Sequence, residues 1–218
     1  MNGQRISLSA AALAGGKSRR MGTDKALLPL ADGGRPMLGM VLDSLSGVAD
    51  EVFVVANDRE RYESFGAVVV PDLHPGAGAL GGIQAVLHWA THDHCLVVAC
   101  DMPFLSATLL QRMADEPRDY DVLIPLVPGE SRQRRDGLVY QTLHAIYSKR
   151  CLQFIDERIA EDNRQVVGFF KDVEVRTLDI AEIARWDPGL RSFFNANTPV
   201  ALSTAAGIHA VGELGLNA

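Results

Sequence analysis

The chain has 218 residues, of which 47% are hydrophobic and 22% are charged, and its formal net charge is −6. This size and composition favour one substantial α/β domain, or at most two small ones, and a mildly acidic chain of this kind is a poor candidate for binding nucleic acid. The apolar N-terminal stretch is too short to span a bilayer, and three cysteines without a CxxC pair fit a reducing compartment, so we expect a cytoplasmic protein that contacts no membrane.

Six continuous apolar runs predict buried parallel strands, because strands that are covered on both faces are apolar throughout instead of alternating. They span residues 6–13, 51–57, 67–70, 95–100, 120–127 and 173–178. Helical periodicity fills the gaps at residues 36–45, 80–90, 106–114 and 148–160, with Ser106 and Ser148 as expected N-caps. Strands that alternate with helices at this spacing predict right-handed βαβ units in an open α/β sheet, where ligands bind at the carboxyl ends of the strands.

The first strand runs into LAGGKSRRMGTDKALLPL, residues 13–30, which combines two glycines with several cations. Gly15 and Gly16 allow a sharp turn and a close approach of backbone N–H groups to a ligand. A concavity of amides followed by cations suits a polyphosphate, and the cations here are Lys17, Arg19, Arg20 and Lys25. A surface turn with solvated cations is the alternative.

Part of this segment, AALAGGKS, resembles a Walker A loop but departs from it in two ways. Ala11 stands where that loop needs its first glycine. Gly22 and Pro29 interrupt the long helix on whose N-terminus a P-loop holds phosphate. We therefore favour a looping phosphate clamp, although CLVVACD at residues 95–101 could pass for a Walker B strand and keeps a P-loop kinase as an alternative.

The same segment resembles the nucleotidyltransferase signature LAGGxSxRMGxDKxLL. It is most similar to the form found in molybdenum cofactor guanylyltransferases, the family that joins GMP from GTP to molybdopterin. Related cytidylyltransferases usually carry LAAG where this chain has Leu13, Ala14, Gly15 and Gly16. A sister enzyme that uses CTP, or one that acts on another phosphorylated acceptor, would share most of these residues and remains an alternative.

The resemblance extends from Leu13 to Pro199 and implies a fold as well as an activity. The implied fold is a Rossmann-like three-layer nucleotidyltransferase fold, in which a mostly parallel twisted sheet carries helices on both faces. No linker-like composition or internal repeat divides the chain, so we expect a single domain over residues 1–206 and a flexible tail at 207–218. The nucleotide half would occupy residues 1–115, and the acceptor half residues 116–206.

Acidic residues follow two of the other predicted strands. A carboxylate at Asp101 can reach a hard cation that bridges phosphates, although Asp-x-Pro is also a common structural turn. The family that the chain resembles carries its magnesium aspartate in a CDxPfl segment, so the resemblance implies Mg²⁺ as the cofactor, held by Asp101. Asp72 matches the family's nucleotide-binding aspartate, and the glycines after it are expected to approach a base or ribose: Gly76, Gly78, Gly81 and Gly82.

Asn57, at the end of the second predicted strand, offers an amide that suits the edge of a nucleobase. An asparagine that merely starts the turn NDRERY is almost as good an explanation. The glycine segment also departs from the family pattern GPLaG, because Ala79 replaces the proline and predicts a less rigid loop.

The second half carries four candidates for binding the acceptor: His144, Arg164, Asn195 and Asn197. The segment QTLHAIYSK is similar to the family's xPLHAlY segment with Thr142 in place of proline, and His144 is either a ligand or a core histidine. FFNANTP resembles the NxNTP segment that borders the pterin site, and its two asparagines point the same way from an extended chain. Arg164 matches a family arginine ahead of an aromatic pair.

Two further groups of polar residues carry weaker signals. The arginines at positions 132, 134 and 135 could attract a phosphorylated acceptor, but a solvated loop explains them slightly better. His88 and His92 have the i, i+4 spacing of metal ligands, yet they lie at the end of a predicted helix, and we expect no metal there.

Together these features predict an enzyme that transfers GMP from GTP to molybdopterin and releases pyrophosphate. The amides of residues 13–16, with Arg20 and Lys25, would hold the triphosphate, and Asp72 and Asn57 would read the guanosine. The remaining rivals are a P-loop kinase and a catalytically silent module that carries a nucleotide or cofactor. GTP and molybdopterin are the expected small-molecule partners, with transient contacts to proteins that make or accept the cofactor.

Overall fold

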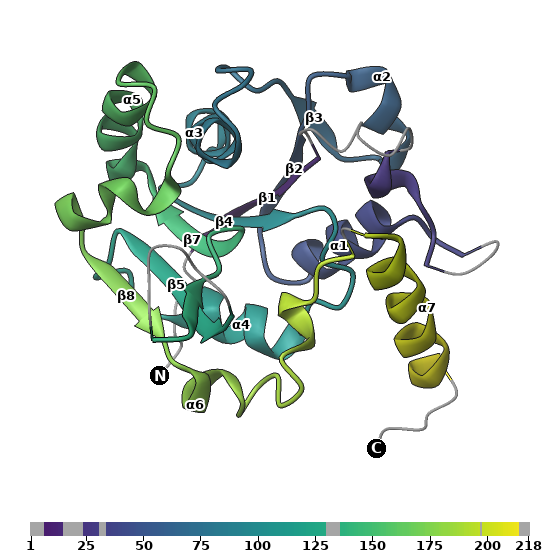
Figure 1. The fold of residues 1–218 in the computed structure, drawn as a ribbon. Helices are drawn as coiled ribbons and strands as arrows, with labels where there is room; N and C mark the ends of the chain where they lie inside the picture. Colours follow the sequence, from purple (N-terminus) through teal and green to yellow (C-terminus); the bar gives the residue numbers. More distant parts are fainter. Residues whose placement is uncertain (1–6, 15–23, 31–33, 130–135, 197, 214–218) are drawn as a thin grey trace.

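The computed structural model describes residues 7–14, 24–30, 34–129, 136–196 and 198–213. Its eight strands form one sheet in the order β3-β2-β1-β4-β7-β5-β6, and β8 pairs with β5 outside this path (Figure 1). The strands are β1 (Ser9–Leu13), β2 (Glu51–Val55), β3 (Val68–Val70), β4 (His94–Ala99), β5 (Val122–Pro128), β6 (Leu138–Tyr140), β7 (His144–Ser148) and β8 (Val175–Leu178).

The sheet is mostly parallel, as the sequence predicts, but two strands run against the others. Strands β1 to β4 are parallel to one another, and β5 and β8 are parallel to each other. Strand β7 lies between the two groups and is antiparallel to both β4 and β5, so β5 runs in the same direction as β1. Strand β6 is antiparallel to β5 and therefore shares the direction of β7.

Each of the six predicted apolar runs contains a strand, whereas β6 and β7 are absent from the prediction. Strand β7 begins with a histidine and ends with a serine, so only its three central residues form an apolar run. The predicted helix at 148–160 overlaps its end. In the structure Ser148 closes the strand, its hydroxyl accepts from Arg150 N–H at 3.2 Å, and a 3₁₀ turn leads into α5 (Leu152–Ala160).

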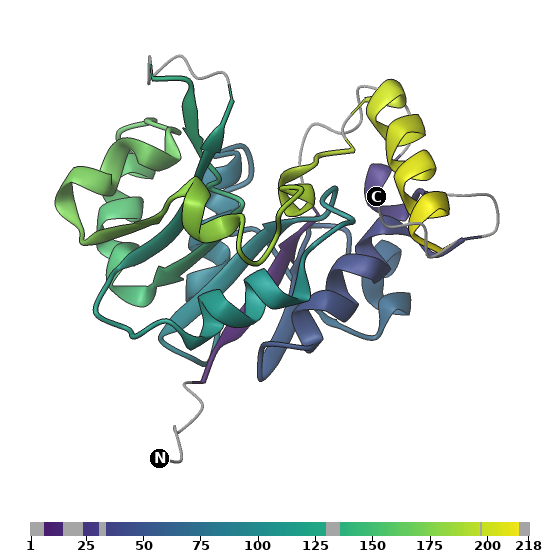
Figure 2. The same cartoon turned by 90° about the horizontal axis from the view of Figure 1, so that it is seen from below.

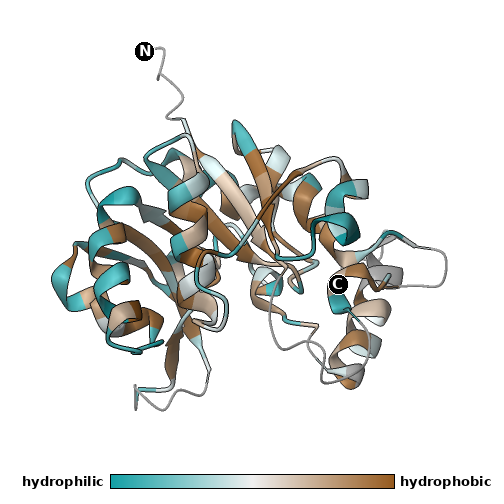
Figure 3. Cartoon of the chain, turned by 90° about the horizontal axis from the view of Figure 1, so that it is seen from above, coloured by the Kyte–Doolittle hydropathy of each residue, from teal (hydrophilic) through white to brown (hydrophobic). Residues whose placement is uncertain are grey.

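Helices cover both faces of the sheet, which confirms the three-layer prediction. α1 (Met37–Ser46) and α4 (Ala107–Asp115) pack on one face, and α3 (Ala79–Trp89) and α5 on the other. Within β1, Ala10 and Ala12 face the first pair of helices, whereas Ala11 and Leu13 face the second. Figure 3 shows the apolar strands between helices whose outer sides are polar. The hydroxyl of Ser106 caps α4 by accepting from Leu109 N–H at 3.2 Å, as predicted.

Three further helices complete the described chain: α2 (Arg59–Tyr62), α6 (Ile180–Ile183) and α7 (Pro199–Glu213). α7 returns to the N-terminal half of the chain (Figure 2). There Ala205 packs with Leu30 and Met37 in a small apolar cluster. Thr198 caps it by accepting from Ala201 N–H at 3.0 Å. The helix continues through residues 207–213, where the sequence predicts a flexible tail, because the apolar run after Pro199 extends the helical pattern. Among the described residues, no helix is both long and apolar enough to cross a membrane.

Candidate active site

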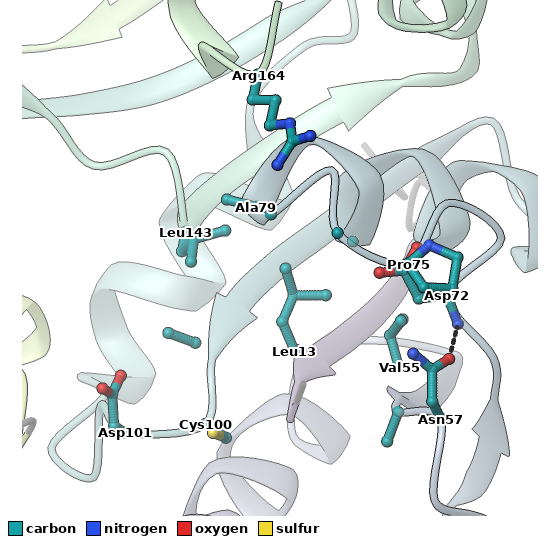
Figure 4. Close-up of a pocket in the computed structure, with 15 residues that line it drawn as sticks. Leu13, Val55, Asn57, Asp72, Pro75, Ala79, Cys100, Asp101, Leu143 and Arg164 are labelled. Carbon is teal, nitrogen blue, oxygen red and sulfur yellow. Dashed lines mark hydrogen bonds between the residues drawn. The ribbon is translucent and has the colours of Figure 1, made fainter. Parts of the chain in front are cut away.

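A pocket of about 520 Å³ lies at the edge of the sheet where the carboxyl ends of β3, β2, β1 and β4 meet. Parallel strands present their carboxyl ends together, so residues far apart in the sequence converge there. Five predicted site residues line the pocket: Leu13, Asn57, Asp72, Asp101 and Arg164 (Figure 4). The carboxyl ends of β1, β2, β3 and β4 thus each contribute one predicted residue to the pocket: Leu13, Asn57, Asp72 and Asp101.

Asn57 and Asp72 form one end of the pocket and fix each other's position. The backbone N–H of Asp72 donates to Asn57 Oδ1 at 2.9 Å, which orients the carboxamide (Figure 4). Asp72 Oδ1 in turn accepts from His74 N–H at 2.9 Å. An amide held by its oxygen keeps its nitrogen as a donor on the other side, and the aspartate keeps a second oxygen. This pair can therefore offer a nucleoside both a donor and acceptors.

The glycines that follow Asp72 divide into two kinds. Gly76 and Gly78 have positive φ values of 101° and 68°, and an added Cβ would meet nothing within 4 Å. Gly81 and Gly82 lie in tight packing, because a Cβ at Gly81 would lie 2.9 Å from Ala77 Cβ and one at Gly82 would lie 2.8 Å from Leu13 Cδ1. Gly82 therefore lets α3 approach β1 closely, and it also lines the pocket together with Gly76 and Gly78, whereas Gly81 packs against the turn that precedes α3.

Asp101 lies at the opposite end of the nucleotide half, just after β4. Burial raises the pKa of its carboxyl, and a backbone hydrogen bond and the charge of Lys25 only partly offset this effect. The backbone carbonyl of Asp101 accepts from Ala196 N–H at 2.9 Å, which attaches the end of β4 to the FFNANTP segment. A partly buried carboxylate that is costly to ionise favours a cation beside it.

The residues around Asp101 fit a magnesium ion that arrives with its substrate. No group of three or more histidine, cysteine or acidic side chains lies close enough to hold a metal among the residues that the structure describes. Mg²⁺ commonly takes one or two protein carboxylates and completes its shell with water and substrate phosphates. A single aspartate on a rigid strand end fits that requirement, and it does not fit a structural metal bound by protein alone.

The glycine-rich segment is described at its two ends. Leu13 lines the pocket, and the backbone N–H of Ala14 donates to Val55 O at 3.1 Å. The amide of Ala14 is therefore engaged with β2, which differs from the expectation that it holds phosphate. Lys25 begins a 3₁₀ helix, Lys25–Leu27, and its charge acts on Asp101. Gly15, Gly16 and Arg20 lie outside the described residues.

Arg164 brings the acceptor half to the pocket. It lies between α5 and the 3₁₀ helix Val166–Asp172, and its guanidinium forms an ion pair with Asp162 at 2.8 Å. Leu143, which precedes β7, also lines the pocket, although it is not among the residues predicted from the sequence. Its position follows from a three-residue interruption between β6 and β7, and the only signal in the sequence was its place beside His144.

His144 occupies the core and does not line the pocket. It is the first residue of β7, it is fully buried, and its ring centroid lies 4.9 Å from that of Phe193. Burial lowers its pKa to about 4, which the carboxylate of Asp187 only partly opposes. The ring is thus neutral at pH 7. Of the two roles that the sequence left open, the structure favours the core histidine.

The asparagine segment is only partly described. Asn195 Nδ2 donates to Phe193 O at 3.2 Å, and the neighbouring Ala196 N–H donates to Asp101 O, so Asn195 lies near the Asp101 end of the pocket. Asn197 lies outside the described residues, as do the loop arginines at 132, 134 and 135.

The fold and site define a nucleotidyltransferase, and comparison with known proteins agrees. The family model for the MobA-like NTP transferase domain matches residues 10–175. A probable molybdenum cofactor guanylyltransferase from Pelotomaculum thermopropionicum is 38% identical over 86% of each chain. Among solved structures, the molybdopterin-guanine dinucleotide biosynthesis protein A of Archaeoglobus fulgidus has a TM-score of 0.75 and 28% identity, covering 93% of this chain and 98% of its own.

The chain therefore belongs to the MobA-like NTP transferase family. A 2-C-methyl-D-erythritol 4-phosphate cytidylyltransferase from Thermus thermophilus shares the fold, with a TM-score of 0.67 at 19% identity over 95% of this chain and all of its own. Family membership removes the P-loop kinase as a rival, because the family transfers a nucleotidyl group on a different fold.

Proposed function

We propose that this enzyme transfers GMP from GTP to molybdopterin, releasing pyrophosphate and forming the guanine dinucleotide form of the molybdenum cofactor. The observation that carries the proposal is the single pocket whose lining includes the Asn57–Asp72 pair, Asp101 and, from the acceptor half, Arg164. One cavity thus offers groups for a nucleoside, for phosphates and for a second anionic substrate. The guanylyltransferase names of its relatives support this choice of substrates.

The reaction needs charge control more than acid–base chemistry. A phosphate oxygen of molybdopterin bonds to the α-phosphorus of GTP, and the bond from that phosphorus to the β-bridging oxygen breaks as pyrophosphate leaves. The attacking phosphate is already anionic, so no strong general base is required. The obstacle is bringing several anions together, and catalysis becomes a matter of positioning and electrostatic stabilisation.

Each described site residue has a role in that scheme. Asp72 and Asn57 hold the guanosine, Lys25 neutralises the triphosphate, and Arg164 attracts the phosphate of the acceptor. Asp101 would hold Mg²⁺, and the ion would supply positive charge that offsets the charge of the phosphates. Arg20, Gly15, Gly16, Asn195 and Asn197 keep the roles that the family resemblance implies.

Calorimetric titration with GTP, CTP and ATP, each with magnesium, tests the proposal first. Wild type should prefer GTP, and Lys25→Ala should lose most of the affinity, after which turnover is measured with molybdopterin as pyrophosphate release. A preference for CTP would make the chain a sister transferase. Absence of binding to all three nucleotides would contradict the proposed activity and leave a silent module as the explanation.

A further inference from the structure

A single hydroxyl joins the two described ends of the glycine-rich segment. Tyr62, the last residue of α2, donates toward the carbonyl oxygen of Ala14 at 2.9 Å and also hydrogen-bonds to the carboxylate of Asp24. Ala14 precedes residues 15–23 and Asp24 follows them. The two ends of the signature segment thus meet at one side chain that comes from a different βα unit.

The tyrosine is placed to act through this hydroxyl. Its side chain is 4% exposed and belongs to the core cluster beneath the site, so the ring cannot swing away without leaving a cavity. Burial and the nearby Asp24 carboxylate raise the pKa of Tyr62 well above its ordinary value. The group therefore stays protonated, and its proton is shared between two acceptors of which the carboxylate is the stronger.

Asp24 in turn sets the position of Lys25. Asp24 is the N-cap of the 3₁₀ helix Lys25–Leu27, where its Oδ1 accepts from Ala26 N–H at 3.2 Å. Its Oδ2 also pairs with Arg61 Nη1 at 3.3 Å, and its side chain is only 14% exposed. A carboxylate held by a tyrosine, an arginine and a backbone amide has little freedom, and Lys25 is the next residue along the chain.

We propose that Tyr62 is a positioning residue that aims Lys25 at the nucleotide phosphates by fixing Asp24 against the end of β1. This inference rests on the proposed function for the role of Lys25, but the fixation itself is a property of the free protein. A tyrosine that served stability alone would support the core without fixing the backbone around Lys25 or affecting the binding of nucleotide through Lys25. Amide exchange rates and GTP affinity distinguish these two roles.

The first measurement compares amide hydrogen exchange in wild type, Tyr62→Phe and the matched control Tyr120→Phe. Tyr120 is 2% exposed and hydrogen-bonds to Arg118 Nη1 at 2.7 Å, and it does not line the pocket. Tyr62→Phe should raise exchange at the Ala26, Leu27 and Leu28 amides about tenfold, the effect of losing one hydrogen bond to a charged group. Tyr120→Phe should leave those amides unchanged. Unchanged exchange in Tyr62→Phe would overturn the proposal.

The second measurement is a double-mutant cycle on the Kd for GTP with magnesium and on kcat/KM. Tyr62→Phe should weaken both about tenfold in the wild-type background and add little in the Lys25→Ala background, because the effect travels through Lys25. Additive losses would mean that Tyr62 acts through stability and would overturn its positioning role. If Tyr62→Phe does not fold, Asp24→Asn replaces it in the same cycle.

The two measurements test the positioning role of Tyr62 and the guanylyltransferase activity independently of each other. If wild type binds no nucleotide, the guanylyltransferase proposal fails, and the exchange rates in the free protein still decide whether Tyr62 fixes Asp24. If wild type binds GTP and the cycle is additive, the function stands and the positioning role falls.

Discussion

The two halves of the pocket are built differently. In the nucleotide half, Asn57, Asp72 and Asp101 each follow a parallel strand, and the pairing of those strands brings them to one edge. In the acceptor half, the sheet turns antiparallel at β7, and the pocket residues come from connections: Leu143 from the break before β7 and Arg164 from the segment after α5. Regular geometry thus places the first set, and local loop conformation places the second.

The difference extends to how firmly the side chains are held. Asp72 and Asn57 are fixed by backbone amides at 2.9 Å, and Asp101 is partly buried. Arg164 depends on an ion pair with Asp162 in which the two side chains are 57% and 81% exposed. Exposed pairs of this kind contribute about 0–1 kcal/mol, so they restrain a side chain only weakly. Substitutions should therefore cost most in the nucleotide half.

Asp101→Ala should have the largest effect. If Asp101 holds Mg²⁺ as proposed, removing its carboxylate should lower kcat for GMP transfer by roughly 10³-fold, because the positive charge that stabilises the transition state is lost or misplaced. The rate of pyrophosphate release with saturating magnesium measures this loss. Asp115→Ala, at the exposed end of α4, is the control and should behave as wild type. Turnover near the wild-type rate in Asp101→Ala would contradict the expectation that substitutions cost most in the nucleotide half.

Asp72→Ala should have the second largest effect, and it should weaken the binding of GTP. The variant loses a nucleoside contact and the acceptor for His74 N–H, so KM for GTP should rise about tenfold or more while kcat changes less. Asp72→Asn retains an oxygen that can accept from His74 N–H and should recover part of the affinity. Steady-state kinetics with varied GTP separate KM from kcat. A fall in kcat with unchanged KM would contradict the nucleoside role of this residue.

The contrast between strand-end residues and residues held by tertiary contacts explains which features could be predicted from the sequence. The six strands β1 to β5 and β8, the layers and the strand-end residues were predictable, because continuous apolar runs mark strands and parallel strands share an edge, although β3 and β8 are less buried than predicted. The packing role of Gly82 was not, since it depends on how closely α3 approaches Leu13. Strand β7 was missed because it begins with a histidine and ends at Ser148, which the sequence suggested as the N-cap of a helix. Tyr62 was missed because it acts through a contact across 38 residues.

Arg164→Met should have a smaller and more selective effect. The variant keeps the aliphatic stem but removes the charge on the acceptor side, so KM for molybdopterin should rise several-fold, about 1 kcal/mol, with the Kd for GTP unchanged. Arg158→Met provides the control, because Arg158 pairs with Glu161 and Asp172 and does not line the pocket. A loss of GTP affinity in Arg164→Met would show that the two halves do not divide the substrates between them.

Substitution of His144 should have the smallest effect on catalysis, and it should change how the stability of the fold depends on pH. His144→Leu should leave KM for molybdopterin unchanged, because the ring lies in the core. Its pKa is about 4 in the folded protein and 6.5 in the reference state, so the unfolded chain binds a proton between these values that the folded chain does not. Wild type should then lose stability as pH falls from about 6.5 to about 4, by roughly 3 kcal/mol from this group.

The comparison of wild type with His144→Leu isolates that contribution from the other titrating groups. Urea unfolding at pH 7 and near pH 4 should show a steeper loss of stability in wild type than in the variant, which lacks the titrating ring. Parallel losses would mean that the imidazole protonates as readily in the folded protein as in the unfolded chain. The ring would then have access to solvent, and His144 would again be a candidate ligand for the acceptor. In that case a strand residue, and not only residues from connections, would contribute to the acceptor half of the site.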